Sequence, residues 1–226
     1  MEEKIQKIQN LLSKLNITVT SEKEFKYFIE AFVHNSFANE HKEYRNYQYL
    51  EFLGDALLQY LSTKKIFFEH QNLKEGSATK LRSALVNRET LANLANKLGL
   101  VDCMIFTKKS FINGKNDKID SDLFESFCAA LYITKGIDFL MEFLSTYLFP
   151  LIPYFLKNEL RDPKSEFQEY VQSYKISQIH YLNKEVKNGF ESILMVDGQI
   201  YGKGFGASKK QAEKEAASNA LSKLKK

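Results

Sequence analysis

The chain has few of the residues that hold small secreted domains together. It has only two cysteines, Cys103 and Cys128, which are too few for a disulfide framework and lack the spacing of a metal site. Cys128 lies in FCAALY, where a thiol typically packs as a small buried apolar side chain. This thiol content fits a reducing compartment, and we expect a cytoplasmic protein.

Long uninterrupted apolar runs are also missing. The most apolar stretch, residues 137–156, contains Asp138, Glu142 and Pro150, which argues against a membrane span and for a core helix that stops near the proline. The opening MEEKIQKIQNLL is charged and amphipathic, without the apolar core of a signal peptide. We therefore expect no membrane partner.

The net charge is only +4, but it is unevenly distributed. Residues 163–226 hold 11 lysines and 7 acidic residues, whereas residues 1–162 hold 21 basic and 21 acidic residues. The whole excess of positive charge thus lies in the carboxyl-terminal part. This asymmetry favours a nucleic-acid-binding module there.

The first part of the chain, residues 1–157, has the pattern of successive helices. Ser21 and Glu24 have capping-box spacing ahead of a helical apolar pattern. Residues 49–70 are apolar over most of a helical circumference, which predicts a central helix. Strand-like alternation does not compete with helix in this part.

The second part follows a short polar linker at residues 158–162. Residues 163–226 predict a helix, three strands with a hairpin at Asp197-Gly198, and a final alanine-rich helix capped by Ser208. The predicted fold is therefore multidomain, with an all-α domain followed by a small α+β domain of order α-β-β-β-α.

Two pairs of acidic residues stand in otherwise apolar helical sequence. Glu51 and Asp55, in YLEFLGDALL, are four residues apart, or about 40° around a helix; Asp122 and Glu125, in DLFESFCAAL, are three apart, or about 60°. Two such helices can converge on four carboxylates, which stay ionised together only beside cations. Oxygen ligands favour a hard divalent ion such as Mg²⁺ or Mn²⁺, and such sites serve phosphodiester hydrolysis. Acids at this spacing can also form a solvated face or a salt bridge.

The motifs resemble those of a known family. YLEFLGDALL is similar to the signature of ribonuclease III, and FVHNSFA (32–38), EGSATKLRSALVNRETLANLA (75–95) and SDLFESFCAALY resemble further family segments in the family's order. DPKSEFQEYVQ and GKGFGASKKQAEKEAA resemble the two ends of a double-stranded-RNA-binding domain. The resemblance covers nearly the whole chain.

The resemblance implies a Mg²⁺-dependent nuclease domain that forms a homodimer, with Mn²⁺ able to substitute. Its metal ligands would be Glu51, Asp55, Asp122 and Glu125, with Asp55 and Glu125 catalytic, and Glu75 would be a secondary acid at the dimer interface. The implied reaction is hydrolysis of both strands of double-stranded RNA, leaving 5′-phosphate and 3′-hydroxyl ends. The implied role is processing of ribosomal and messenger RNA precursors.

The resemblance also implies a set of RNA contacts in the carboxyl-terminal domain. The start of the last helix offers free N–H groups and a favourable dipole to phosphate. Recognition would depend on shape, 2′-hydroxyls and phosphates, so sequence preference would be weak. The expected contacts are Lys164, Gln168, Glu169, Lys184, Lys187, Ser208, Lys209, Lys210 and Lys214.

Two departures from the family pattern stand out. Gln48 and Tyr49 occupy positions where the family usually has Glu and Arg. We expect Gln48→Glu to change the metal optimum modestly, and identical Mg²⁺ titrations of the two proteins would contradict this. NKEV at 183–186 replaces the usual Gly-Pro-x-His loop between the first two strands, with Val186 at the His position. Lys184 and Lys187 would then supply phosphate contacts instead.

Two other functions stay open from the sequence. One is a double-stranded-RNA-binding protein of the same family that has lost cleavage, although a pure binder has no need of four acids in apolar helices. The other is an unrelated metal-dependent phosphohydrolase with an RNA-binding tail, which would act on DNA or small phosphate compounds.

Overall fold

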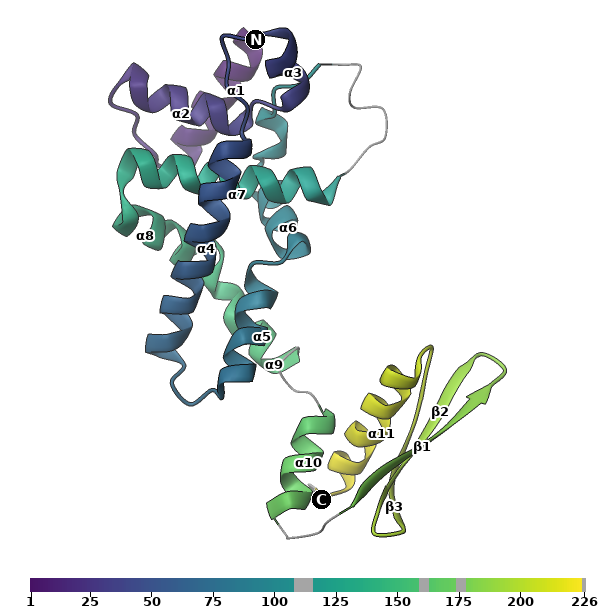
Figure 1. Ribbon diagram of the computed structural model, residues 1–226. Coiled ribbons are helices and arrows are strands. Elements are labelled where there is room, and N and C mark those ends of the chain that lie inside the picture. The colour runs from purple at the N-terminus through teal and green to yellow at the C-terminus, as the bar shows by residue number, and fades with distance from the viewer. Residues whose placement is uncertain (108–115, 159–162, 174–177, 225–226) are drawn as a thin grey trace. The chain divides into compact units, whose positions relative to one another are not determined.

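The computed structural model describes residues 1–107, 116–158, 163–173 and 178–224 (Figure 1). The chain divides into two compact units, Met1–Phe155 and Leu156–Lys226. The expected linker at 158–162 lies outside the described residues from position 159 onward, so its extent stays a prediction.

In its described residues the first unit consists of helices and short turns. The helices are α1 (Glu2–Lys14), α2 (Glu22–Phe32), α3 (Asn35–Glu40), α4 (Gln48–Glu69), α5 (Glu75–Leu85), α6 (Arg88–Leu98), α7 (Asp117–Lys135), α8 (Ile137–Tyr147) and α9 (Ile152–Asn158). The described residues of this unit also include the 3₁₀ turns η1 (Val101–Cys103) and η3 (Phe149–Leu151).

Capping residues set several of these helix ends. The hydroxyl of Ser21 accepts the backbone N–H of Glu24 at 3.2 Å and starts α2. The side chain of Asn87 does the same for Thr90 at 2.8 Å and starts α6, which ends at Gly99 with φ 82°. These side chains satisfy donors that a helix start leaves free.

Helix α7 forms the centre of the first unit. Every residue from Asp120 to Leu131 is buried except Glu125. The helix packs against α2, α4, α6 and α8 (Figure 1). The ring of Phe127 lies 6.0 Å from that of Phe28 and 5.8 Å from that of Phe32, and each buried Phe contributes about 1.5–3 kcal/mol of transfer free energy.

The expectation that residues 49–70 form the central helix is wrong for the single chain. One face of α4 is buried, but the opposite face leaves Tyr49, Phe52, Tyr60 and Phe67 exposed by 77%, 72%, 59% and 69%. A helix that is apolar all round predicts burial, but the pattern does not distinguish burial within one chain from burial against a partner.

One apolar segment near the end of the first unit is long enough and apolar enough to cross a membrane, by length and composition alone. It spans Ile137–Asn158 and is divided among α8, η3 and α9. Leu140, Leu144 and Ile152 from this stretch are buried in the core.

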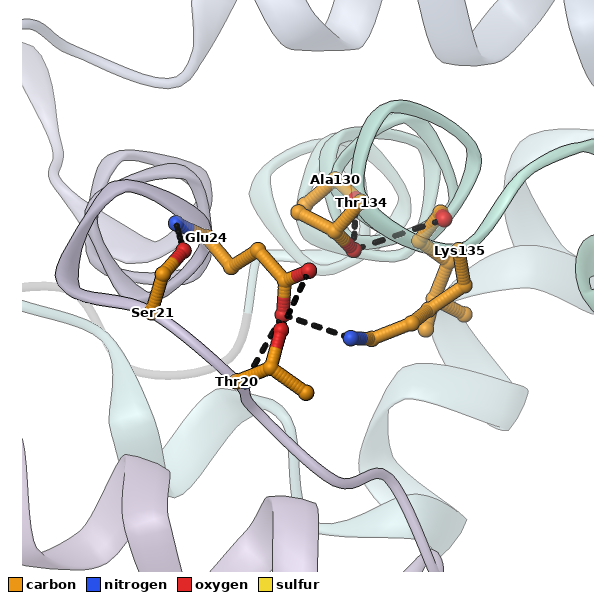
Figure 2. Close-up of polar contacts among 7 residues, drawn as sticks. Thr20, Ser21, Glu24, Ala130, Thr134 and Lys135 are labelled. Carbon is orange, nitrogen blue, oxygen red and sulfur yellow. Dashed lines mark hydrogen bonds and ion pairs between the residues drawn. The ribbon is translucent and has the colours of Figure 1, made fainter.

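A polar cluster links the start of α2 to the end of α7 (Figure 2). Lys135 Nζ donates to Glu24 Oε2 at 2.6 Å, and the carboxylate also accepts the backbone N–H and the hydroxyl of Thr20 at 2.9 and 3.0 Å. The bond from Lys135, followed by those from Thr20, lowers the pKa of Glu24 to about 2. Glu24 therefore stays ionised far into the acidic range.

The second unit has the predicted order α-β-β-β-α, and this prediction is confirmed. Its elements are α10 (Pro163–Ser173), β1 (Ile179–Val186), β2 (Gly189–Val196), β3 (Gln199–Gly206) and α11 (Lys209–Leu224), with the strands antiparallel in the order β1-β2-β3. The β2–β3 turn is Asp197-Gly198, with φ of 47° and 82°, as two-residue hairpins require.

The β1–β2 connection is a tight turn. Residues 183–186, which read as part of a strand although they replace a loop of the family, form the end of β1 and pair with β2 up to Val186 opposite Gly189. The turn consists of Lys187 and Asn188 alone. The segment continues the strand because its backbone pairs fully with β2.

Glycines on β3 allow α11 to lie very close to the sheet. A Cβ on Gly202 would lie 2.1 Å from the backbone oxygen of Ala216, and one on Gly204 would lie 2.2 Å from its nitrogen. The sheet and helix enclose a core that includes Phe167 and Leu194. The glycine-rich GKGFG and the alanine-rich helix are therefore two halves of one contact.

Candidate functional site

The two acidic motifs meet where α4 crosses α7. A Cβ on Gly54 would lie 2.0 Å from the backbone oxygen of Glu125, so only a glycine lets the helices approach this closely. Glu51 and Asp55 flank Gly54 on α4, and Asp122 and Glu125 lie on α7. The crossing point thus sets the distance between the two acid pairs.

Three of the four predicted acids form one group in the part of the chain that the structure describes. Glu51, Asp122 and Glu125 each offer a carboxylate oxygen, and these oxygens lie within 4.8 Å of one another. Asp122 is buried, and Glu51 and Glu125 are half-buried. Asp55 is exposed and lies outside this group. The structure therefore brings together three carboxylates, with the fourth beside them.

The crowding of these acids changes their ionisation. Burial, followed by the charges of Asp55, Asp122 and Glu51, raises the pKa of Glu125 to about 8. Burial and the charges of Asp122 and Asp55 also raise the pKa of Glu51. The cluster has more negative than positive charge. The atoms that could bind a metal are all carboxylate oxygens, the ligand type that hard divalent cations prefer. The residues therefore fit a divalent metal ion.

Lys118 places one positive charge at the edge of this cluster. Its Nζ lies 2.8 Å from Asp122 Oδ2. Its charge lowers the pKa values of Glu51 and Glu125, opposing the effect of the acids. Asn116 caps α7 by accepting the backbone N–H groups of Lys118 and Ile119. It thus fixes where the helix begins and where Lys118 lies on it.

One residue that the sequence did not single out, Tyr47, lies near Asp122. Tyr47 is buried, and burial together with the charges of Asp122 and Glu51 raises the pKa of Tyr47 well above its usual range. The Tyr47 ring lies 6.0 Å from that of His34, whose Nδ1 is 2.9 Å from Ser36 Oγ. Tyr47 precedes α4 without a recognisable local signal, whereas His34 and Ser36 belong to the FVHNSFA motif.

Glu75, another predicted residue, lies away from the three-acid group. Glu75 starts α5, is exposed, and accepts a hydrogen bond from Thr79 at 3.1 Å. It lines a groove with Thr63, which is more than three helical turns, or about 18 Å, along α4 from Glu51. Gln48 is exposed at the first position of α4. Within one chain, Glu75 is not brought to the acid group.

The second unit presents basic residues at the start of α11. The hydroxyl of Ser208 accepts the backbone N–H of Gln211 at 3.3 Å and caps the helix, and the Gln211 side chain accepts the N–H of Ala207, the residue before the cap, at 3.1 Å. The predicted contacts on this helix and on the β1–β2 hairpin are all exposed, and they are Lys184, Lys187, Ser208, Lys209, Lys210 and Lys214.

The predicted contacts on α10 differ in their surroundings. Gln168 and Glu169 are exposed. Lys164 donates to Glu213 Oε2 at 2.5 Å, and Asn183 donates to the other oxygen at 2.7 Å, so Glu213 joins α10, β1 and α11. The Lys164 ammonium also lies 4.5 Å from the ring centre of Tyr181. Lys164 is thus part of the structural framework, and its contact with RNA stays a prediction.

The sequence matches two family models. One, described as Ribonuclease-III-like, covers residues 24–152, and the other, described as the double-stranded RNA binding motif, covers residues 163–224. The first match includes α4 and α7 with all four acids. The second includes α10, the three strands and α11.

Curated relatives and solved structures resemble the chain in the same way. Ribonuclease 3 of Mycoplasma mobile is 42% identical over 98% of this chain and 91% of its own length. Ribonuclease 3 of Bacillus velezensis is 34% identical over 99% of this chain and 92% of its own length. A structure of the ribonuclease III nuclease domain from Campylobacter jejuni, described as flexible in a region involved in dimer formation, is 29% identical with a TM-score of 0.57. It matches 65% of this chain and 99% of the solved one.

Proposed function

The chain belongs to the ribonuclease III family, and we propose that it hydrolyses phosphodiesters of double-stranded RNA at the acid group between α4 and α7. The observation that supports this most directly is the convergence of Glu51, Asp122 and Glu125 within 4.8 Å, from two helices far apart in sequence. A double-stranded RNA binding motif on the same chain supports the substrate class.

The cofactor is proposed to be Mg²⁺, with Mn²⁺ able to replace it. Glu51, Asp122 and Glu125 would hold the ion, and Asp55 would join them from the next turn of α4. Small hard ions with oxygen ligands and retained waters suit such a half-open carboxylate group. When bound, the ion would polarise the phosphate and activate a water as the nucleophile.

The chain's own residues prepare this site. Tyr47 lies buried near the Asp122 carboxylate, and the close crossing at Gly54 keeps the acids of α4 next to those of α7. Such fixed placement lowers the reorganisation needed during reaction. We propose that the products have 5′-phosphate and 3′-hydroxyl ends, with Asp55 and Glu125 indispensable for cleavage.

A homodimer is proposed to form through the exposed face of α4. One side of this helix carries exposed apolar and aromatic residues at intervals of three to seven positions, and they are Tyr49, Phe52, Ala56, Tyr60 and Phe67. Exposed apolar stripes of this kind mark interaction surfaces. The dimer would place one acid group on each strand of a duplex, and Glu75 would contribute from the interface. Tyr49, where the family usually has Arg, would add an aromatic contact to this face.

The carboxyl-terminal unit is proposed to bind the RNA duplex through phosphates and 2′-hydroxyls. Its exposed lysines at the start of α11 and on the β1–β2 turn would contact phosphates, and the contacts to A-form RNA would carry little sequence preference. The proposed role is processing of ribosomal and messenger RNA precursors in the cytoplasm.

A cleavage experiment tests this function. A uniform RNA duplex is incubated with the wild type, Glu125→Gln and Glu142→Gln, each with Mg²⁺ and with EDTA, and scored for cleavage and gel shift. Glu142 is an exposed acid on α8 and serves as the matched control. Only the wild type and Glu142→Gln with Mg²⁺ should cut, and Glu125→Gln should still bind.

The same experiment separates the alternatives. Binding without cleavage by the wild type, with Mg²⁺ and with Mn²⁺, would identify a binding protein that has lost activity, and Gln48 would become the first position to change. Cleavage of DNA or of small phosphate compounds in place of duplex RNA would favour an unrelated phosphohydrolase.

A further inference from the structure

We propose that Lys118 is a built-in counter-ion that competes with the divalent metal for Asp122 and so sets the metal affinity of the site. The proposal rests on the proposed metal centre and assigns a role to a residue outside the four acids. It follows from the ion pair between Lys118 Nζ and Asp122 Oδ2, which are 2.8 Å apart.

Lys118 shares one face of α7 with two of the acids. Lys118, Asp122 and Glu125 are four and three residues apart, so all three lie within about 60° of one another around the helix. An ammonium group at one end of this row faces the carboxylates that a metal ion would also need. The Lys118 ammonium and a metal ion would then compete for the same oxygen of the buried Asp122 carboxylate.

The two partners of the pair differ in their freedom to move. The side chain of Asp122 is 8% exposed, whereas that of Lys118 is 58% exposed. The lysine can therefore swing into water and release the oxygen while the carboxylate stays in place. Displacement by an incoming cation would cost little side-chain rearrangement.

The helix itself does not favour a lysine at this position. Lys118 is the second residue of α7, where the positive end of the helix dipole opposes a cation. The order Lys before Asp at i and i+4 is also the weaker orientation for such pairs. Lys118 is therefore held mainly by the acids, and a doubly charged ion would displace it.

Metal binding to the full-length protein without RNA provides the test. Calorimetric titration with Mn²⁺ compares the wild type with Lys118→Met, which keeps an unbranched side chain one atom shorter and removes the charge, and with Lys118→Arg, which keeps the charge. Lys97→Met, at an exposed position on α6, is the matched control. Partly exposed ion pairs have modest energies, so Lys118→Met should bind Mn²⁺ about fivefold more tightly.

The other variants should behave differently. Lys118→Arg and Lys97→Met should bind Mn²⁺ as the wild type does. Melting temperatures give a second measure, because without metal Lys118→Met should melt below the wild type and gain more from added Mn²⁺. Equal or weaker Mn²⁺ binding by Lys118→Met would overturn the proposal.

Asp122→Asn separates this proposal from the one on which it rests. Loss of Mn²⁺ binding in Asp122→Asn supports the metal centre, and the role of Lys118 is then decided by the Lys118 variants alone. Unchanged binding in Asp122→Asn would refute the metal centre, and the competition at Asp122 with it.

Discussion

Replacing Gly54 by alanine should separate the two helices that hold the acids. The new Cβ would lie 2.0 Å from the backbone oxygen of Glu125, whereas ordinary contacts begin at 3.4 Å. The helices must therefore move apart by about 1.4 Å at this point. No side-chain rotation can relieve the contact, because the obstructing atom belongs to the backbone of α7.

The expected cost combines two opposing effects. Alanine favours a helix interior over glycine by about 1 kcal/mol, which stabilises the variant. Overpacking a tight contact costs about 1–3 kcal/mol and more where only backbone can yield, as it must here. We expect a net loss of about 2 kcal/mol, or a fall of roughly 4–8 °C in the melting temperature of the first unit.

Melting curves and Mn²⁺ titrations of Gly54→Ala measure both consequences. Mn²⁺ affinity should fall, because Glu51 moves away from Asp122 and Glu125. Gly76→Ala is the control, since a Cβ at Gly76 in α5 has no atom within 4 Å. Wild-type stability together with wild-type Mn²⁺ affinity in Gly54→Ala would refute the account of this crossing.

Three further predictions concern other parts of the chain. Phe52→Asp should convert the dimer to monomer in analytical ultracentrifugation, whereas Tyr154→Asp, at an exposed position outside α4, should not; a monomeric wild type would contradict the proposed interface. The contacts of Glu24 lower its pKa from the ordinary 4.5 to about 2, so the ionised carboxylate stabilises the folded protein at pH values above 4.5. This contribution to the free energy of unfolding should be lost as the pH falls toward 2. Glu24→Gln should therefore melt below the wild type at pH 7 and with it near pH 2, and a constant difference would contradict this. The Lys209→Ala, Lys210→Ala double variant should bind duplex RNA more weakly, with the slope of log affinity against log salt smaller by about 2; an unchanged slope would exclude phosphate contacts.

The sequence predicted features that depend on neighbouring residues. Capping at Ser21 and Ser208, the turn at Asp197-Gly198 and the order α-β-β-β-α all follow from side chains close in sequence. The same holds for the pairing of acids along each helix, since spacing of three or four residues fixes a shared face.

Several features that depend on contacts between distant segments were not predicted, although the convergence of the two acid pairs was. The proximity of Tyr47 to Asp122 joins residues 75 positions apart, and nothing near Tyr47 in the sequence indicates it. The exposed face of α4 was expected to be buried, because hydropathy does not specify which chain covers a face. Lys118 did have a local signal, its position four residues before Asp122, but a pattern of acidic residues alone does not include it.

The central claim is that the acids of α4 and α7 bind a divalent ion. Anomalous diffraction from crystals soaked in Mn²⁺ tests it most directly. The account predicts a peak about 2 Å from carboxylate oxygens of Glu51, Asp122 and Glu125, with Lys118 turned away from Asp122. Fully ordered acids without a peak, and with Lys118 still bonded to Asp122, would contradict it.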